Sequence, residues 1–189
     1  SKLDFAQLRA DFPERKHQAI AFADLRQLME IKLKQMLAQN KTRGHFLERF
    51  QRLIDDYNSG SLSIEEAYAQ LVDQAKDLSE EAERAARNDM NETEQELFDL
   101  LKKDQLTQAE EKKVKLAAKQ LLFTLFDTQN KLLIQEWHRQ RQSQERVRTH
   151  IQNVMNEYLP ESYGRAIFAE KTEIVFGHFF GLAEAGIVA

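Results

Sequence analysis

Only six glycines and two prolines occur in the 189 residues, and this shortage of turn-forming residues limits the possible folds more than any other feature. A β-sandwich or a doubly wound α/β fold needs many tight connections, which depend on glycine and proline. Hydrophobic residues make up 42% of the chain, which favours a folded core over disorder. We therefore predict an all-α fold, an irregular bundle of about seven to eight helices.

Apolar residues recur at helical spacing between residues 46 and 57, and polar residues fill the gaps. This pattern predicts an amphipathic helix that ends at Asn58-Ser59-Gly60, where Asn or Gly can adopt left-handed backbone. The preceding helix, from Pro13 to about Gln39, has a broader apolar set, so we expect it to be covered on two sides. The stripe of residues 46–57 consists of Phe46, Leu47, Phe50, Leu53, Ile54 and Tyr57.

Three further helix starts are indicated by a Ser or Thr that is followed by Glu three residues later. In this capping box, each of the two side chains accepts a hydrogen bond from the backbone amide of the other residue. The three pairs are Ser63 with Glu66, Thr93 with Glu96, and Thr107 with Glu110. The last helix is predicted to begin near Lys171, and the polar segment 138–146 either stays helical or breaks near Ser143.

We interpret the chain as one helical domain over 1–189, which can divide into two sub-bundles over 1–88 and 92–189. Charge is unevenly spread along it. Residues 1–52 carry eleven Lys or Arg against six acidic residues, residues 53–111 carry five against seventeen, and residues 112–189 carry eleven against eight. Because the acidic middle would repel phosphates, we do not expect the whole domain to clamp DNA.

The sequence contains no pattern typical of a catalytic, metal or cofactor site. Cysteine is absent, which excludes thiol chemistry, and the five histidines lie in different predicted elements. No glycine-rich loop has the spacing of a phosphate-binding loop. We therefore predict a non-catalytic domain without metal or cofactor. The absence of a signal peptide and of a long apolar run favours a cytoplasmic protein without membrane contact.

One basic segment has the composition of an interaction surface, because Arg forks bind carboxylates or phosphates and Trp is a frequent interface anchor. Three interpretations stay open: a solvated face against the acidic middle, a protein interface, and a nucleic-acid contact. The candidates are Trp137, Arg139, Arg141, Arg146 and Arg148. A secondary basic face on the helix of residues 46–57 and the turn before it comprises Arg43, Arg49 and Arg52.

Four segments also carry a family resemblance. Asn40-Lys41-Thr42-Arg43 precedes the apolar stripe and Tyr57-Asn58 follows it. The other three segments are Ser63-Ile64-Glu65-Glu66 with Leu71-Val72 and Ala75-Lys76, the run Glu94 to Leu101, and Trp137 with Arg146-Val147-Arg148 and Tyr158-Leu159-Pro160. From about Leu3 to about Phe180, the chain resembles the C-terminal helical region of the motor-nuclease (R) subunit of type I restriction-modification enzymes.

The resemblance implies a fragment of a longer polypeptide, an ATP-dependent type I site-specific deoxyribonuclease. The nuclease domain and two helicase-type ATPase domains, with their ATP and Mg, would lie in parts that this sequence does not contain. In that family the helical region packs on the motor domains and helps attach the R subunit to the methyltransferase (M) and specificity (S) subunits. Docking is the function that the resemblance implies, with DNA contacted only indirectly. A helical module that grips the translocated duplex is the alternative.

Overall fold

A computed structural model describes residues 4–14 and 16–188, and its described part contains nine α-helices, three short 3₁₀ helices and no strand. The prediction of an all-α multi-helix bundle is therefore confirmed. The α-helices are α1 (Phe5–Asp11), α2 (Gln18–Gln39), α3 (Gly44–Asn58), α4 (Ile64–Ala82), α5 (Arg84–Arg87), α6 (Glu92–Leu101), α7 (Gln108–Leu125), α8 (Arg141–Tyr158) and α9 (Arg165–Glu184). The 3₁₀ helices are η1 (Phe12–Glu14), η2 (Lys41–Arg43) and η3 (Trp137–Arg139).

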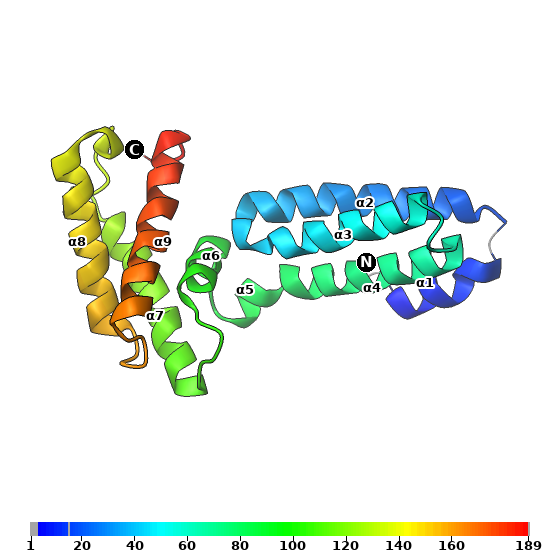
Figure 1. The fold of residues 1–189 in the computed structure, drawn as a ribbon, viewed down its shortest axis with the longest axis horizontal. Coiled ribbons are helices and arrows are strands. Elements are labelled where there is room, and N and C mark those ends of the chain that lie inside the picture. Colours follow the sequence, from blue (N-terminus) through cyan, green and yellow to red (C-terminus); the bar gives the residue numbers. More distant parts are fainter. Residues whose placement is uncertain (1–3, 15, 189) are drawn as a thin grey trace. The chain divides into compact units, whose positions relative to one another are not determined.

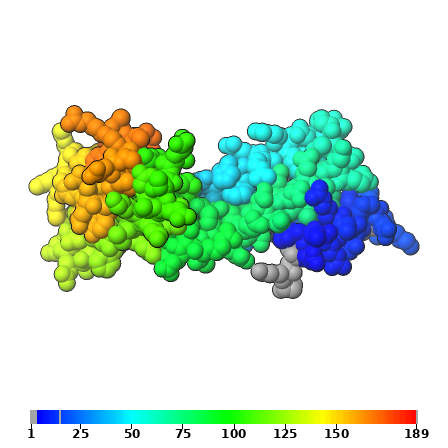
Figure 2. Space-filling view, turned by 90° about the horizontal axis from the view of Figure 1, so that it is seen from below, coloured from blue at the N-terminus to red at the C-terminus, as the bar shows by residue number. Residues whose placement is uncertain are grey.

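The chain divides into two compact units, an N-terminal unit (Ser1–Glu92) and a C-terminal unit (Thr93–Ala189). In the N-terminal unit, α2 and α4 run in the same direction and α3 runs opposite to both (Figure 1). The short helix α1 packs against α4, and Figure 2 shows its dark blue surface beside α4. At this end of the core, the rings of Phe12 and Tyr68 stack with centroids 3.6 Å apart.

Helix α2 is covered on one face only, so the prediction of cover on two sides is wrong for this structure. Its buried residues follow a single stripe at helical spacing, namely Phe22, Leu25, Met29, Leu33 and Met36. Three large apolar residues outside that stripe, Ile20, Leu28 and Ile31, are exposed. The helix also begins at Gln18, later than the predicted start at Pro13. Pro13 lies in η1, and Arg15 falls outside the described residues. A broad apolar set therefore does not by itself show that both faces are buried.

The C-terminal unit is built on α7, α8 and α9, which run up, down and up (Figure 1). Buried side chains of all three helices meet between them, and the largest aliphatic and aromatic ones include Leu121, Leu125, Ile151 and Phe179. Helix α6 joins this unit through polar contacts of its last turn. The Lys171 ammonium donates to the Leu100 carbonyl at 3.0 Å.

Two of the three predicted capping boxes form. Ser63 and Thr107 each exchange both hydrogen bonds with the Glu three residues later, and α4 and α7 begin directly after them. Thr93 does not start its helix, because α6 begins one residue earlier, at Glu92. The last helix begins at Arg165, earlier than the predicted Lys171. The polar segment 138–146 breaks at Gln140, between η3 and α8, and Ser143 lies inside α8. Residues 126–136 before it are not α-helical.

Tyr163 ties the connection between α8 and α9 to the end of α6. Its buried hydroxyl donates a hydrogen bond to the Leu101 carbonyl at 2.9 Å. Burial, assisted by the negative charge of Glu110, raises the pKa of Tyr163 from 10.0 to about 12. The folded protein therefore favours the protonated phenol.

We expect Tyr163 to titrate near pH 12 in an alkaline titration that is followed by tyrosinate absorbance. Because the folded pKa is the higher one, its stabilising contribution is complete below pH 10 and is lost as the pH rises through about 12. Tyr163→Phe should remove this late step and lower the free energy of unfolding by about 1 kcal/mol, since the Leu101 carbonyl loses its donor. Tyr57→Phe is the control and should retain the late step. Ordinary titration of every tyrosine in the wild type would contradict the prediction.

Candidate functional site

Among the described residues of the N-terminal unit, the most deeply buried charge belongs to Arg43, at the turn between α2 and α3. Asn40 shapes this turn: its amide donates to the Met36 carbonyl at 3.0 Å, and its side-chain oxygen accepts from the Thr42 amide at 3.0 Å and from the Thr42 hydroxyl at 2.6 Å. These bonds cap η2, the 3₁₀ turn that ends with Arg43. The turn therefore holds the Arg43 side chain inside the unit, where only 2% of it is exposed.

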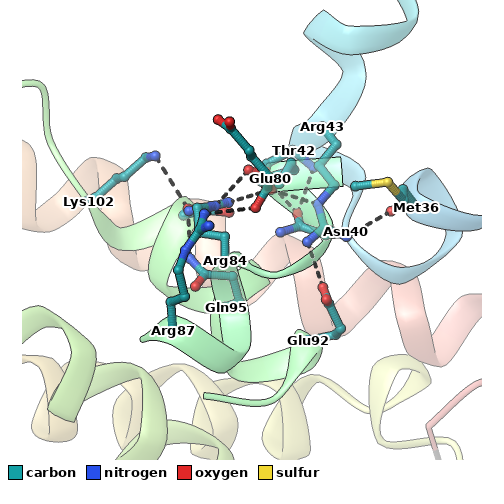
Figure 3. A network of polar contacts seen from close by, with 12 residues as sticks. Met36, Asn40, Thr42, Arg43, Glu80, Arg84, Arg87, Glu92, Gln95 and Lys102 are labelled. Atoms are coloured by element: carbon teal, nitrogen blue, oxygen red, sulfur yellow. Dashed lines mark hydrogen bonds and ion pairs between the residues drawn. The ribbon is translucent and has the colours of Figure 1, made fainter. Parts of the chain in front are cut away.

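Two carboxylates and a backbone carbonyl surround the Arg43 guanidinium (Figure 3). Nε donates to Glu81 Oε1 at 2.9 Å, Nη2 donates to Glu92 Oε2 at 2.7 Å, and Nη1 donates to the Met36 carbonyl at 3.3 Å. Arg84 binds the same Glu81 carboxylate with two bonds, of 2.8 and 2.9 Å. We call Arg43, Glu81, Arg84 and Glu92 the Arg43 cluster.

Arg43 was expected to lie on an exposed basic face, and this prediction is wrong for Arg43. Its charge is neutralised within the unit, so it serves packing and is not available to a partner. Arg49 and Arg52 of the same predicted face are exposed. Arg49 forms an ion pair with Asp77 at 3.0 Å. The secondary basic face is thus reduced to two surface arginines, one of which is already paired.

Trp137, predicted as an interface anchor, has no exposed surface. Its ring packs edge-on against Phe176 and Phe180 of α9, with centroids 5.9 and 6.2 Å away. The prediction of an exposed anchor is therefore wrong. Trp137 fixes η3 to α9 and so holds the start of α8 in place.

The four arginines that follow Trp137 do not act as one surface. The Arg148 guanidinium lies 4.0 Å from the centre of the Phe176 ring and is also ion-paired with Glu173. Arg139 pairs with Glu136 at 2.8 Å but remains well exposed. Arg141 and Arg146 are exposed and form no ion pair within residues 4–14 and 16–188. These two arginines, together with the exposed Arg139, are the part of the candidate site that is accessible to a partner.

Arg146 also lines a shallow groove of about 410 Å³ between α8 and the segment before η3. His150, on the same wall, lies with Nε2 2.7 Å from the Thr124 hydroxyl, and its burial lowers its pKa. Glu145 lines the groove as well, so the groove carries both signs of charge. Nothing in this arrangement selects one ligand.

A second buried polar contact lies in the C-terminal unit. His178 and Glu96 are both buried, and His178 Nε2 lies 3.4 Å from Glu96 Oε1. Among the residues that the structure describes, no three His, Asp or Glu side chains are grouped so that they could hold a metal ion. No described helix is both long enough and apolar enough to cross a membrane.

Sequence reasoning missed the Arg43 cluster and the His178–Glu96 pair. Glu81 lies 38 residues beyond Arg43 in the chain, and no short spacing links such partners. The only local signal was Asn40-Lys41-Thr42, a cap sequence that fixes where the following arginine points.

Comparison with protein families gives a match that covers nearly the whole chain. Residues 1–182 match the family described as type I restriction enzyme HindI endonuclease subunit-like, C-terminal. No curated protein and no solved structure matches. The family match confirms the resemblance that was stated from the sequence.

We expect Arg43→Met to lower the free energy of unfolding by about 3 kcal/mol, because Glu92 loses its guanidinium and Glu81 loses one of two. The matched control is Arg52→Met on α3, which removes an exposed guanidinium and should change stability by less than about 0.5 kcal/mol. Denaturant unfolding followed by circular dichroism measures both variants. Equal stability of the two variants would show that the Arg43 cluster does not stabilise the unit.

We also expect Trp137→Ala to destabilise the protein by about 3–5 kcal/mol, the usual cost of removing a buried large aromatic side chain. Phe123→Ala, which removes an exposed aromatic ring, should cost less than about 0.5 kcal/mol. The same unfolding experiment compares the two. A small effect of Trp137→Ala would show that η3 is not held by this contact.

Proposed function

The chain belongs to the family of C-terminal domains of type I restriction enzyme HindI endonuclease subunit-like proteins, and from this membership we propose that it is a docking domain. In the proposal, it attaches the ATP-dependent translocase and endonuclease to the methyltransferase and specificity subunits. It also packs on the motor domains of its own polypeptide. The domain itself performs no catalysis and binds no cofactor.

The observation that carries the proposal is the set of large apolar side chains on the outer faces of α2 and α7. Exposed apolar residues that gather on one surface are typical of a surface that a partner covers. On α2 they are Ile20, Leu28 and Ile31, and on α7 with its C-cap they are Leu116, Phe123 and Phe126. We expect the outer face of α2 to contact the motor domains. This contact would bury the second side of α2, as its broad apolar set predicted.

Charge supports docking in a different way. Arg141 and Arg146 are both exposed in the first half of α8, five residues apart and therefore about 140° apart around the helix axis. Such side chains at the edge of an interface increase the rate of association and select a partner of opposite charge. Their number is small for a DNA grip, which would need many phosphate contacts.

A DNA-contacting module is the second candidate, and the exposed Arg139, Arg141 and Arg146 are the observation that favours it. The two functions differ in how binding depends on salt. Phosphate contacts release counterions, so DNA binding would weaken steeply as salt increases. Docking through apolar area would persist at physiological salt.

We expect the 189-residue chain to bind the purified methyltransferase–specificity core saturably in calorimetry at physiological salt, with duplex DNA as the parallel titrant giving little heat. Arg141→Glu combined with Arg146→Glu should weaken core binding by roughly tenfold if these arginines contact the core. Arg52→Glu, in the N-terminal unit, is the control for the charge change. Strong, salt-sensitive DNA binding without core binding would overturn docking in favour of the DNA module.

A further inference from the structure

Helix α7 has two apolar faces, and only one of them contributes to the core. The inner face is fully buried and consists of Val114, Ala117, Ala118, Leu121 and Leu125. On the opposite face, Leu116 and Phe123 are seven residues apart and therefore lie two turns apart in one line. Leu116 is 44% exposed and Phe123 is 72% exposed. Phe126, the C-cap, is 49% exposed, and its ring also packs edge-on against the buried Phe179. We call these three residues the α7 stripe.

Lysines border the first part of the α7 stripe, whereas an acidic residue, Asp127, directly follows its last member, Phe126. Residues 112–126 contain four lysines and no acidic residue. Lys112 precedes Leu116 by one turn on the same face, and both Lys112 and Lys113 are exposed. Lys115, closer to the core, is ion-paired with Glu111 at 2.7 Å. The outer face of α7 is thus an apolar line with exposed lysines at its N-terminal end.

We infer that the α7 stripe is the surface of this domain that seats in an apolar groove with acidic edges on the methyltransferase–specificity core. The inference rests on the proposed docking function and adds the face that docks and the chemistry of its partner. The stripe has the helix-in-groove form, in which apolar anchors at i and i+7 enter a groove and charges at its edge fix the orientation. Carboxylates on the partner are the groups that complement lysines 112 and 113.

The outer face of α2 does not carry the same argument. Its exposed apolar residues alternate with Asp24, Glu30 and Lys34, so its charge selects no partner. The neighbouring groove of about 580 Å³ between α2 and α4 is lined by Lys32 and Lys76 as well as by Glu80 and Glu83. If a second copy of the chain were the partner, this groove would not supply edges of purely negative charge for the lysines of α7.

Duplex DNA also fits the α7 stripe poorly. Three large apolar side chains occupy its centre, where a duplex would present hydrophilic phosphates and sugars. The lysines of a single helix can make only a few phosphate contacts, which would give weak binding at physiological salt.

The test compares Phe123→Asp with Ile187→Asp in calorimetric titrations of the methyltransferase–specificity core. Ile187 is 70% exposed in the same unit but lies outside the α7 stripe, so the two substitutions place the same carboxylate on equally exposed positions. We expect Phe123→Asp to weaken core binding by at least about tenfold, because it puts a charge where an apolar anchor is buried. Ile187→Asp should bind like the wild type. Unchanged thermal unfolding of both variants shows that the difference arises at the surface.

Lys112→Glu combined with Lys113→Glu tests the charge of the partner. This variant should bind the core several-fold more weakly at low salt than the wild type, and the difference should shrink as salt increases.

Each contrary outcome is distinguishable. If the wild type binds the core and Phe123→Asp binds equally well, the α7 stripe is not the docking face, and docking itself stands. If the wild type does not bind the core, both proposals fail. If Phe123→Asp instead abolishes binding to duplex DNA, or a self-association seen in sedimentation, the partner is nucleic acid or a second copy, and the inference is overturned.

Discussion

The buried guanidinium of Arg43 is the interaction on which the packing of the N-terminal unit depends. A guanidinium cannot be deprotonated in a protein, so its burial requires carboxylates at fixed positions. Those carboxylates come from the last turns of α4 and from the first residue of α6, while the Met36 carbonyl belongs to α2. Within this unit, the ends of α2 and α4 and the residue Glu92 must therefore come together at one point. This requirement favours one register of α2, α3 and α4 over the alternatives that apolar packing alone would permit.

The sequence was informative where a local rule decides the structure. Shortage of glycine and proline indicated the all-α class, and the capping boxes at Ser63 and Thr107 located two helix starts because both partners lie within one turn. Where tertiary contacts decide, the same reasoning failed. Helix α9 begins six residues before the predicted Lys171, at Arg165, after the Tyr163 turn. The apolar set of α2 could not show which side other helices would cover.

The candidate site shows the same limit. Residue type marked Trp137 and Arg148 as interface candidates, but it could not reveal that α9 places Phe176 against both of them. Arg141 and Arg146 are exposed, although Glu145 lies four residues after Arg141 and directly before Arg146 on the same helix. On α7, Leu116 is exposed although Leu121 and Leu125 of the same helix are buried. Hydrophobicity alone does not distinguish an apolar residue that is buried in the core from one that is exposed on the surface.

The position of Trp137 gives the protein a built-in optical reporter. It is the only tryptophan in the chain, and it lies in the core of the C-terminal unit against Phe176 and Phe180. Its emission therefore reports the loss of packing in that unit alone, whereas far-ultraviolet ellipticity reports helices of both units. Agreement or divergence of the two signals during denaturation measures whether the units unfold as one cooperative body or independently, without any added label.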